Sequence, residues 1–359
     1  MKKVNWLVSI VTVLMVFALL LGACAPSAAP APAPTPAPAP KPVEPIELRY
    51  NTMAPPVHEA VAATLNHIAK ELEKRTDGRV KMTIFWTSAL ASPPEAYKSV
   101  VNGLSDMTDS VAAFAAGKFP AAEIADIPIG YPSSYVMSHA LNDWYNKFKP
   151  KEWDEVQFLF VVSPPPASIG TADKPVLKLA DMKGVTIRTP GARIGTMLEE
   201  MGAVPRPMPI TQVYESLSKG NIEGVALCLE TYKSWKFDEI IKYNTEMDDI
   251  SWSTFIYHVV NKDTFNKMTP QDQKTFLEIC AEAMDLRAKL SDKLLASGKK
   301  DFLALPGREI NQLSAAEAAK FKAIADKMVA KYVSDMNDKG LPGAEYVKYL
   351  RERIAHWSK

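Results

Sequence analysis

Short runs in which apolar and polar residues alternate are separated by longer stretches with an apolar residue at every third or fourth position. Alternation is typical of strands, and the longer spacing is typical of helices with one buried face. The clearest example lies within residues 180–243, where the pattern predicts strand, helix, strand, helix and strand over residues 185–188, 194–201, 204–208, 211–220 and 222–227. Such an order requires a mostly parallel sheet covered by helices, in which ligands bind at the carboxyl ends of the strands.

Arg188 stands at one of these strand ends, directly before a Thr-Pro-Gly turn. An arginine in such a position is commonly a solvated or ion-paired surface residue, so its place in the pattern does not by itself identify a ligand site. In the following cycle, Thr211 is the expected N-cap of the second helix and Gly220 its expected end.

The residues before this region repeat the alternation and predict a first α/β sheet. Strands are expected over residues 47–52, 79–86 and 158–163, and helices over residues 55–78, 92–103 and 134–144. Ser92 and Glu95 have the spacing of a capping box, and Ser134 is the expected N-cap of the third helix.

The chain enters the second sheet near Ser168 and returns to the first around residues 252–260. Two lobes joined by more than one crossing form a hinge with a cleft between them. A capping box at Thr269 and Asp272 starts a helix that continues to about residue 302, a length of roughly 50 Å that would span both lobes. Ser314 caps a further helix that ends before Gly340. We therefore predict lobe I over residues 46–167, completed by about 254–293, and lobe II over residues 168–253, completed by about 294–359.

Residues 1–23 have the features of a lipoprotein signal peptide. Lys2 and Lys3 precede an apolar run over residues 6–23, and small residues stand directly before Cys24. On this interpretation Cys24 becomes the lipidated N-terminus and anchors the protein outside the cytoplasm. The alternative is an uncleaved membrane helix, which needs about 20 apolar residues. The rest of the segment 24–45 is an Ala/Pro linker that favours polyproline II and predicts a semi-rigid spacer.

The net charge of the chain is +1, and removal of Lys2 and Lys3 with the signal peptide changes it to −1. A near-neutral body argues against nucleic-acid binding, which requires a basic face. Two cysteines besides Cys24 remain after processing. Cys228 and Cys280 could form a disulfide outside the cytoplasm, but they lie in unlike sequence contexts, and we expect buried free thiols.

The sequence contains no HExxH, GxSxG or P-loop motif, and its five histidines have no metal-ligand spacing. Its acidic pairs consist of adjacent residues, whose side chains point apart on a helix or a strand. We therefore expect a protein that is not an enzyme, with no catalytic residues, no metal and no cofactor.

Several segments resemble one known family in the same order along the chain. They read KPV, LADMKGVTIRTPG and EMGAVPRPMPITQVYESLSKGNIEG, with VNGLSDM and ADIPIGYPSS before them. Together they resemble the DctP family, the periplasmic solute-binding subunits of tripartite ATP-independent periplasmic (TRAP) transporters, over essentially the whole mature body. The resemblance implies the two-lobed clamshell of periplasmic binding proteins, type II-like, with a long helix spanning both lobes.

The resemblance also implies a function. It indicates an extracytoplasmic receptor that closes on a small organic acid and delivers it to TRAP membrane permease subunits, and we expect a monomer held at the membrane by its lipid. In the family, an arginine at the position of Arg188 receives the ligand carboxylate, a role that suits the planar, paired donors of a guanidinium. A lipid-anchored binding protein that serves a sensor or another transporter class remains the alternative, because its ligand clamp would look the same.

Several residues differ from the family pattern, and these differences indicate which kind of ligand the protein binds. In sialic-acid-type members, polar groups hold the ligand's other functions at the positions of Met53, Val111, Ser168, Ile210 and Leu227. Four of these residues are apolar here and one is a small hydroxyl, so we expect no partners for several ligand hydroxyls or a second charge. Unmatched buried polar groups would cost about 1–3 kcal/mol each. The predicted ligand is a monocarboxylate with an apolar or aromatic body.

Other residues near the inferred cleft have two interpretations. The aromatic residues closest to it could contact ligand, although each could equally belong to the core; they are Trp86, Tyr131, Tyr214 and Trp252. Arg193 and Arg206 could supply a second charge contact, although we expect both to be solvated.

Overall fold

The computed structural model describes residues 45–359. The predicted signal peptide, Cys24 and all of the Ala/Pro linker except Pro45 lie outside the described residues. Residues 45–359 belong to one compact unit, and the following description concerns that unit alone. Among the described residues, every helix is too short or too polar to cross a membrane.

The first sheet has five strands in the order β2-β1-β3-β10-β4. Four of them run in the same direction, and β10 is antiparallel to both of its neighbours, β3 and β4. The bounds are β1 Ile46–Asn51, β2 Val80–Phe85, β3 Met107–Val111, β4 Val156–Val162 and β10 Ile256–Asn261.

The second sheet has six strands in the order β11-β9-β5-β8-β6-β7. It also contains one antiparallel strand, β5, which lies between β8 and β9. The bounds are β5 Ser168–Thr171, β6 Thr186–Thr189, β7 Val204–Pro207, β8 Gly224–Leu227, β9 Tyr243–Glu246 and β11 Glu309–Gln312.

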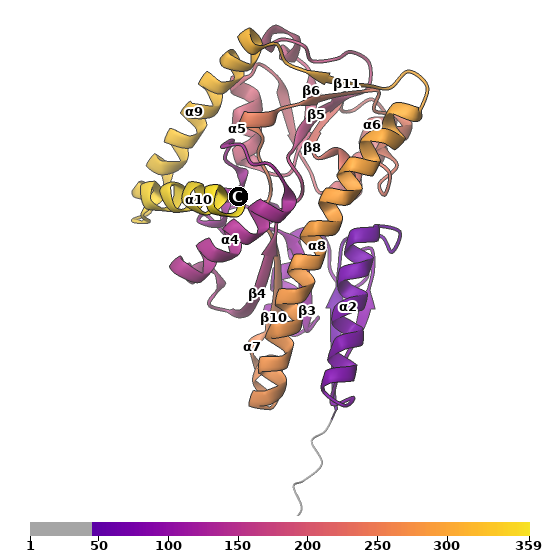
Figure 1. Cartoon of the computed structure of the whole chain (residues 1–359), viewed down its shortest axis with the longest axis vertical. Helices are drawn as coiled ribbons and strands as arrows, with labels where there is room; N and C mark the ends of the chain where they lie inside the picture. Colours follow the sequence, from indigo (N-terminus) through magenta and orange to yellow (C-terminus); the bar gives the residue numbers. More distant parts are fainter. Residues whose placement is uncertain (1–44) are drawn as a thin grey trace, which may run out of the picture. The chain divides into compact units, whose positions relative to one another are not determined.

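Each antiparallel strand directly follows a crossing from a strand of the other sheet. The chain passes from β4 to β5 over residues 163–167 and from β9 to β10 over residues 247–255. Because β5 and β10 run against their neighbours, both crossings connect the edges at which the parallel strands of the two sheets end. The carboxyl ends of both sheets therefore meet at the junction of the lobes (Figure 1).

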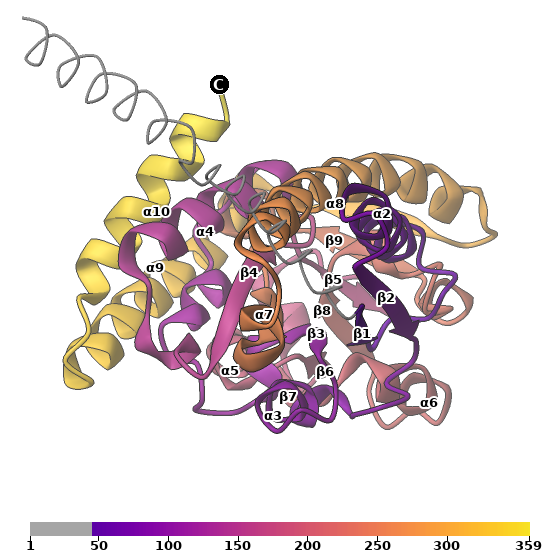
Figure 2. The same cartoon turned by 90° about the horizontal axis from the view of Figure 1, so that it is seen from below.

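Nine α-helices accompany the sheets in the described part of the chain, with short 3₁₀ turns between them. They are α2 Glu59–Arg75, α3 Ala96–Val101, α4 Ser134–Phe148, α5 Ala192–Glu200, α6 Val213–Ser218, α7 Lys262–Asn266, α8 Pro270–Ala304, α9 Ala315–Asp338 and α10 Gly343–Trp357. Helix α8 packs against α2, α4 and β4 of the first lobe and against β11 of the second. Figures 1 and 2 show α8 beside α2. The predicted α/β fold with a helix spanning both lobes is confirmed.

Both faces of each sheet are buried. Successive residues of β8 enter different cores, with Ala226 packing on the side of α5 and α9, and Val225 and Leu227 packing with α6 and Phe302. Strands covered on both faces need apolar side chains in both directions. This explains why several strands are nearly continuous runs of apolar residues in the sequence.

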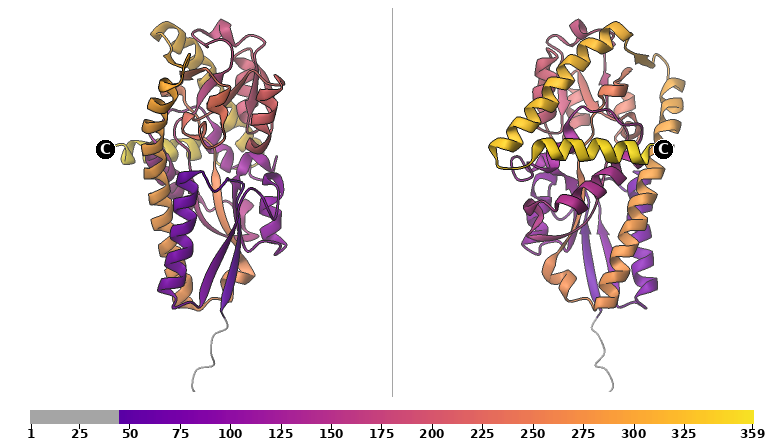
Figure 3. Two further views of the ribbon diagram at one scale, coloured as in Figure 1. Left: turned by 90° about the vertical axis from the view of Figure 1, so that its right-hand side faces the viewer. Right: turned by 60° about the vertical axis from the view of Figure 1, so that its left-hand side comes forward.

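The C-terminal segment divides between the lobes. Helix α9 packs against α5 in the second lobe, whereas α10 packs against α4 in the first. Tyr346, Val347 and Leu350 of α10 are buried in the same core as Trp144 of α4. Figure 3 shows α10 crossing the molecule next to α4. Residues 343–357, which the sequence pattern assigns to lobe II, thus complete the core of the first sheet.

Two of the predicted helix caps are present and three are not. Thr269 and Ser314 accept the expected backbone N–H groups of α8 and α9. Ser133, not Ser134, caps α4, because the Ser134 hydroxyl donates to the carbonyl of Ser163. The side chain of Ser92 makes no capping hydrogen bond, and Thr211 lies within a 3₁₀ turn, Ile210–Gln212, that precedes α6.

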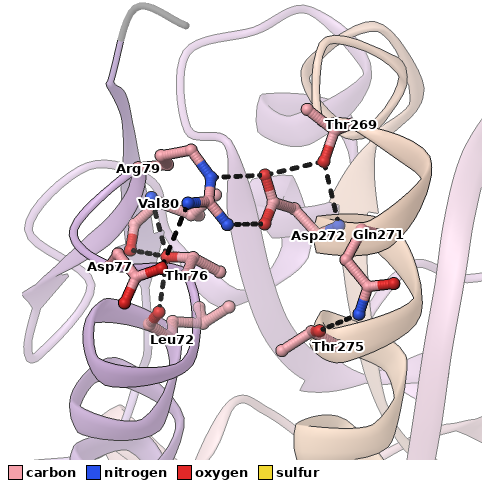
Figure 4. A network of polar contacts seen from close by, with 9 residues as sticks. All are labelled: Leu72, Thr76, Asp77, Arg79, Val80, Thr269, Gln271, Asp272 and Thr275. Atoms are coloured by element: carbon pink, nitrogen blue, oxygen red, sulfur yellow. Dashed lines mark hydrogen bonds and ion pairs between the residues drawn. The ribbon is translucent and has the colours of Figure 1, made fainter.

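An ion pair connects the start of β2 to the first turn of α8 (Figure 4). Arg79 donates from Nη2 to Asp272 Oδ1 at 2.8 Å and from Nε to Asp272 Oδ2 at 3.2 Å. Asp272 is only 2% exposed, and its carboxylate also accepts from the Thr269 hydroxyl at 2.8 Å. The Arg79 guanidinium holds the pKa of this carboxyl below its ordinary value.

We expect Asp272→Ala to lower the free energy of unfolding by about 2–4 kcal/mol, because the substitution removes charge-assisted hydrogen bonds at a buried position and loosens the cap of α8. Asp77→Asn is a matched control, since Asp77 contacts the same guanidinium from a position that is 85% exposed, and asparagine tolerates its positive φ of 48°. It should change the stability by less than about 0.5 kcal/mol. Urea unfolding followed by circular dichroism measures both, and equal effects would contradict the role assigned to Asp272.

Candidate functional site

A cavity of about 100 Å³ lies where the carboxyl ends of the two sheets meet. Residues at the ends of the parallel strands line it, including Val111 of β3, Val162 of β4 and Leu227 of β8. Ile256, at the start of the antiparallel β10, contributes from the same edge. A buried water needs about 10–15 Å³ of such space, so the cavity has room for a small molecule of several non-hydrogen atoms.

Arg188 reaches this cavity from β6 and is 3% exposed. Its Nε donates to the carbonyl of Met208 at 3.0 Å. No carboxylate of residues 45–359 acts on its charge, and burial alone lowers the pKa of the guanidinium to about 9. The side chain therefore remains protonated at neutral pH and presents a buried positive charge without an acidic partner among the described residues.

The Thr-Pro-Gly turn after β6 brings the second lobe against the first. A Cβ atom at Gly191 would lie 2.7 Å from the Cβ of Ala113, so a larger residue would force the two segments apart. The Thr189 hydroxyl donates to the carbonyl of Gly191 at 2.7 Å and fixes the turn. This close approach places Arg188 next to residues of the first sheet.

Five of the other predicted contact residues line the same cavity; they are Met53, Val111, Ile210, Leu227 and Trp252. They form apolar walls from both lobes. Together with Arg188, they place one cationic group against a largely hydrocarbon surface.

Four predicted residues lie away from this cavity. Trp86 packs against the core beneath α2, and Tyr214 is 38% exposed and donates to Glu239. Tyr131 donates to the carbonyls of Trp252 and Pro164, one in each crossing segment. Ser168 donates to the carbonyl of Leu227 and to Asn244 Oδ1.

The two other arginines considered in the sequence also differ in environment. The prediction that Arg193 is solvated is wrong. It pairs with Glu123 at 2.6 Å and Asp335 at 3.3 Å and lies over the ring of Tyr332, because its helix packs against acidic residues of both neighbouring segments. Arg206 is exposed, as predicted.

The five compared positions carry no charged side chain, but three charged side chains from other positions also line the cavity. Arg287 lines it from α8, Asp109 from β3 and Glu230 from the 3₁₀ turn after β8. All three are less than 9% exposed. The five compared positions lie on strands and the segments that connect them, whereas Arg287 lies on the long helix α8. The sequence does contain one indication that Arg287 faces inward. It falls on the same stripe of α8 as the apolar residues Cys280, Ala283 and Met284.

Two histidines complete this part of the cavity. His258 lies opposite Asp109 in the β3–β10 pair, and its Nδ1 is 2.7 Å from the hydroxyl of Tyr50. Burial, with the Arg287 charge adding to it, lowers the pKa values of His258 and His58 well below the ordinary range. Both rings are therefore neutral at physiological pH.

Cys228 and Cys280 are both buried and unpaired, as expected, and Cys228 lines the cavity. Residues 45–359 contain no group of three or more His, Cys, Asp and Glu side chains arranged to hold a metal ion.

Comparison with known proteins identifies the family. The model for bacterial extracellular solute-binding protein, family 7 (DctP) matches residues 50–335. Among solved structures, a marine metagenome TRAP solute-binding protein described as specific for aromatic acid ligands, in complex with metahydroxyphenylacetate, is 26% identical. Its TM-score is 0.83, with 88% of this chain and 100% of that chain covered.

Two further solved structures are similar to this chain to about the same degree. A TRAP solute-binding protein from Rhodoferax ferrireducens T118, in complex with copurified benzoate, is 25% identical with a TM-score of 0.82, covering 87% of this chain and 98% of its own. One from Bordetella bronchiseptica, with bound (R)- and (S)-mandelate, is 27% identical with a TM-score of 0.81, covering 87% and 99%. The family match spans more than half of the chain, which therefore belongs to the DctP family of TRAP-transporter solute-binding proteins, a family of receptors and not of enzymes.

Proposed function

We propose that this receptor binds a monocarboxylate with an apolar or aromatic body and that Arg188 binds the carboxylate. The observation that carries the proposal is the buried guanidinium of Arg188, whose charge no acidic side chain of residues 45–359 compensates. A buried unpaired charge is costly, and a ligand carboxylate that accepts paired hydrogen bonds from it would remove that cost. Members of the family bind small carboxylates and work with membrane permeases.

The walls of the cavity support the second part of the proposal. Met53, Val111, Ile210, Leu227 and Trp252 offer hydrocarbon and aromatic surface on several sides of the space beside Arg188. A ring or short aliphatic chain would bury its apolar area there, at about 25 cal/mol per Å² removed from water. The relatives with bound metahydroxyphenylacetate, benzoate and mandelate are consistent with a single-ring acid as the ligand.

We expect Arg188→Ala to weaken benzoate binding by about 2–5 kcal/mol, the range for removing one member of a buried charge pair. Arg188→Lys should restore only part of the affinity, because an ammonium group cannot make the forked contact. Isothermal titration calorimetry on the purified protein measures both effects.

Arg206→Ala is the matched control for this experiment. Arg206 pairs with Arg188 in the β6–β7 register but is exposed, so its removal takes away a nearby positive charge without touching the cavity. The affinity of Arg206→Ala for benzoate should stay within about twofold of the affinity of the unmodified protein, since exposed charges contribute little. A similar loss in both variants would show that Arg188 acts through long-range charge and not by contact.

We also propose that the receptor acts as a monomer held at the extracytoplasmic face by lipid on Cys24. The small residues before Cys24 and the basic and apolar segments preceding them support this anchor. If residues 1–24 are replaced by a cleavable secretory signal peptide that leaves no cysteine at the cut, the protein should move from the membrane fraction to the soluble periplasmic fraction, as judged by immunoblotting of fractionated cells. Mature protein that begins at a residue other than Cys24, or that carries no lipid by mass spectrometry, would contradict the anchor.

A further inference from the structure

Arg193 makes an ion pair that runs from the second lobe to the first. It lies on α5, where its neighbour Ile194 is buried in the core of the second lobe. Its partner Glu123 lies in the 3₁₀ turn Ala122–Asp126, where Ile124 is buried in the core of the first lobe. The Nε and Nη2 atoms of Arg193 donate to the same oxygen of Glu123, Oε2, at 2.9 and 2.6 Å. The contact therefore joins two side chains that move apart when the lobes separate.

The other groups that hold the Arg193 guanidinium are also attached to the first lobe. Asp335 Oδ2 accepts from both Nη atoms at 3.3 Å, and the ring centre of Tyr332 lies 5.0 Å from Cζ. Both residues belong to the C-terminal part of α9, where Tyr332 and Met336 are buried in the core of the first lobe. The Tyr332 hydroxyl donates to the carbonyl of Ala121 at 3.1 Å. Arg193 of the second lobe thus enters a site built by the first.

A short turn connects this ion pair to the cavity. Only four residues separate Arg193 from Arg188, which lines the cavity. Gly191, within that turn, lies against Ala113 of the first lobe, where even a Cβ atom would not fit. The closure that brings Arg188 to a ligand therefore also brings Arg193 to Glu123.

We infer that Arg193 is a positioning residue for ligand binding, which raises the affinity of the receptor by stabilising the closed arrangement of the lobes. It is not among the residues that line the cavity, so it acts through the lobes and not by contact with the ligand. The lobes must open for the ligand to leave, so a contact made only in the closed state slows release.

The burial of the ion pair makes such an effect measurable. The side chains of Arg193 and Glu123 are 11% and 28% exposed, so water and salt screen this pair less than a fully exposed surface pair. The inference rests on the proposed function only for its probe, benzoate.

The test measures benzoate affinity by isothermal titration calorimetry and benzoate release by stopped-flow fluorescence on the purified protein. Arg193→Ala should weaken binding by about three- to tenfold, with most of the change in the dissociation rate. Glu123→Gln, which keeps the size of the side chain and removes its charge, should act in the same direction. The double variant should lose no more affinity than Arg193→Ala alone, because both single changes break one contact.

Arg353→Ala is the matched control. Arg353 of α10 pairs with Asp143 of α4 at 2.7 Å and is 25% exposed, and both helices belong to the first lobe. Its removal breaks an ion pair without affecting the junction of the lobes, so benzoate affinity and release should stay within about twofold of the unmodified protein. Circular dichroism shows whether each variant is folded, and Glu123→Gln tests the same contact if Arg193→Ala does not fold.

Unchanged affinity in Arg193→Ala, an equal loss in Arg353→Ala, or losses that add in the double variant would overturn the inference and leave the proposed function in place. If the unmodified protein does not bind benzoate, the proposed ligand class fails, and small-angle X-ray scattering of the ligand-free protein decides the inference. Arg193→Glu should then have a larger radius of gyration than the unmodified protein, because three carboxylates would meet at the junction. Equal radii would overturn the role of Arg193.

Discussion

The uncompensated charge of Arg188 is the constraint on which the rest of the site depends. Burying an ion in an apolar environment is costly, and proteins usually offset that cost with a neighbouring ion of opposite charge. Here the only hydrogen bond recorded for the guanidinium among the described residues goes to the carbonyl of Met208, which leaves other donors free for a ligand. The close approach of Gly191 to Ala113 and the apolar strand ends keep this charge away from bulk water.

The other buried or half-buried arginines show how differently the same side chain is used in this fold. Arg79 and Arg193 are held by carboxylates and connect elements that lie far apart in the sequence. Arg287 forms no ion pair among the described residues, although the charges of Glu230 and Asp109 act on its guanidinium. Arg79 and Arg193 stabilise the scaffold through ion pairs, whereas Arg188 has no acidic partner among the described residues. That difference supports Arg188 as the group that binds a ligand anion.

Local patterns in the sequence predicted much of the fold but only part of the site. Thr269 and Ser314 were identified as caps because capping chemistry involves residues only a few positions apart. Strand β3 was missed because its buried residues include Thr108, Asp109 and Ser110, which hide the apolar signal. Arg188 could be predicted from its motif. Arg287 could not, because its place in the cavity depends on how α8 packs between the lobes. Sequence periodicity also cannot show that Trp252 lines the cavity whereas Trp86 packs, partly buried, against the core of the first lobe.

The most direct test of the account is a crystal structure of the protein with a bound aromatic monocarboxylate. Both carboxylate oxygens should accept from the Arg188 guanidinium at about 2.7–2.9 Å, the distance typical of charge-assisted hydrogen bonds, with the ring against Val111 and Leu227. A ligand whose carboxylate lies on another cation, with Arg188 paired to a side chain of the protein, would contradict it.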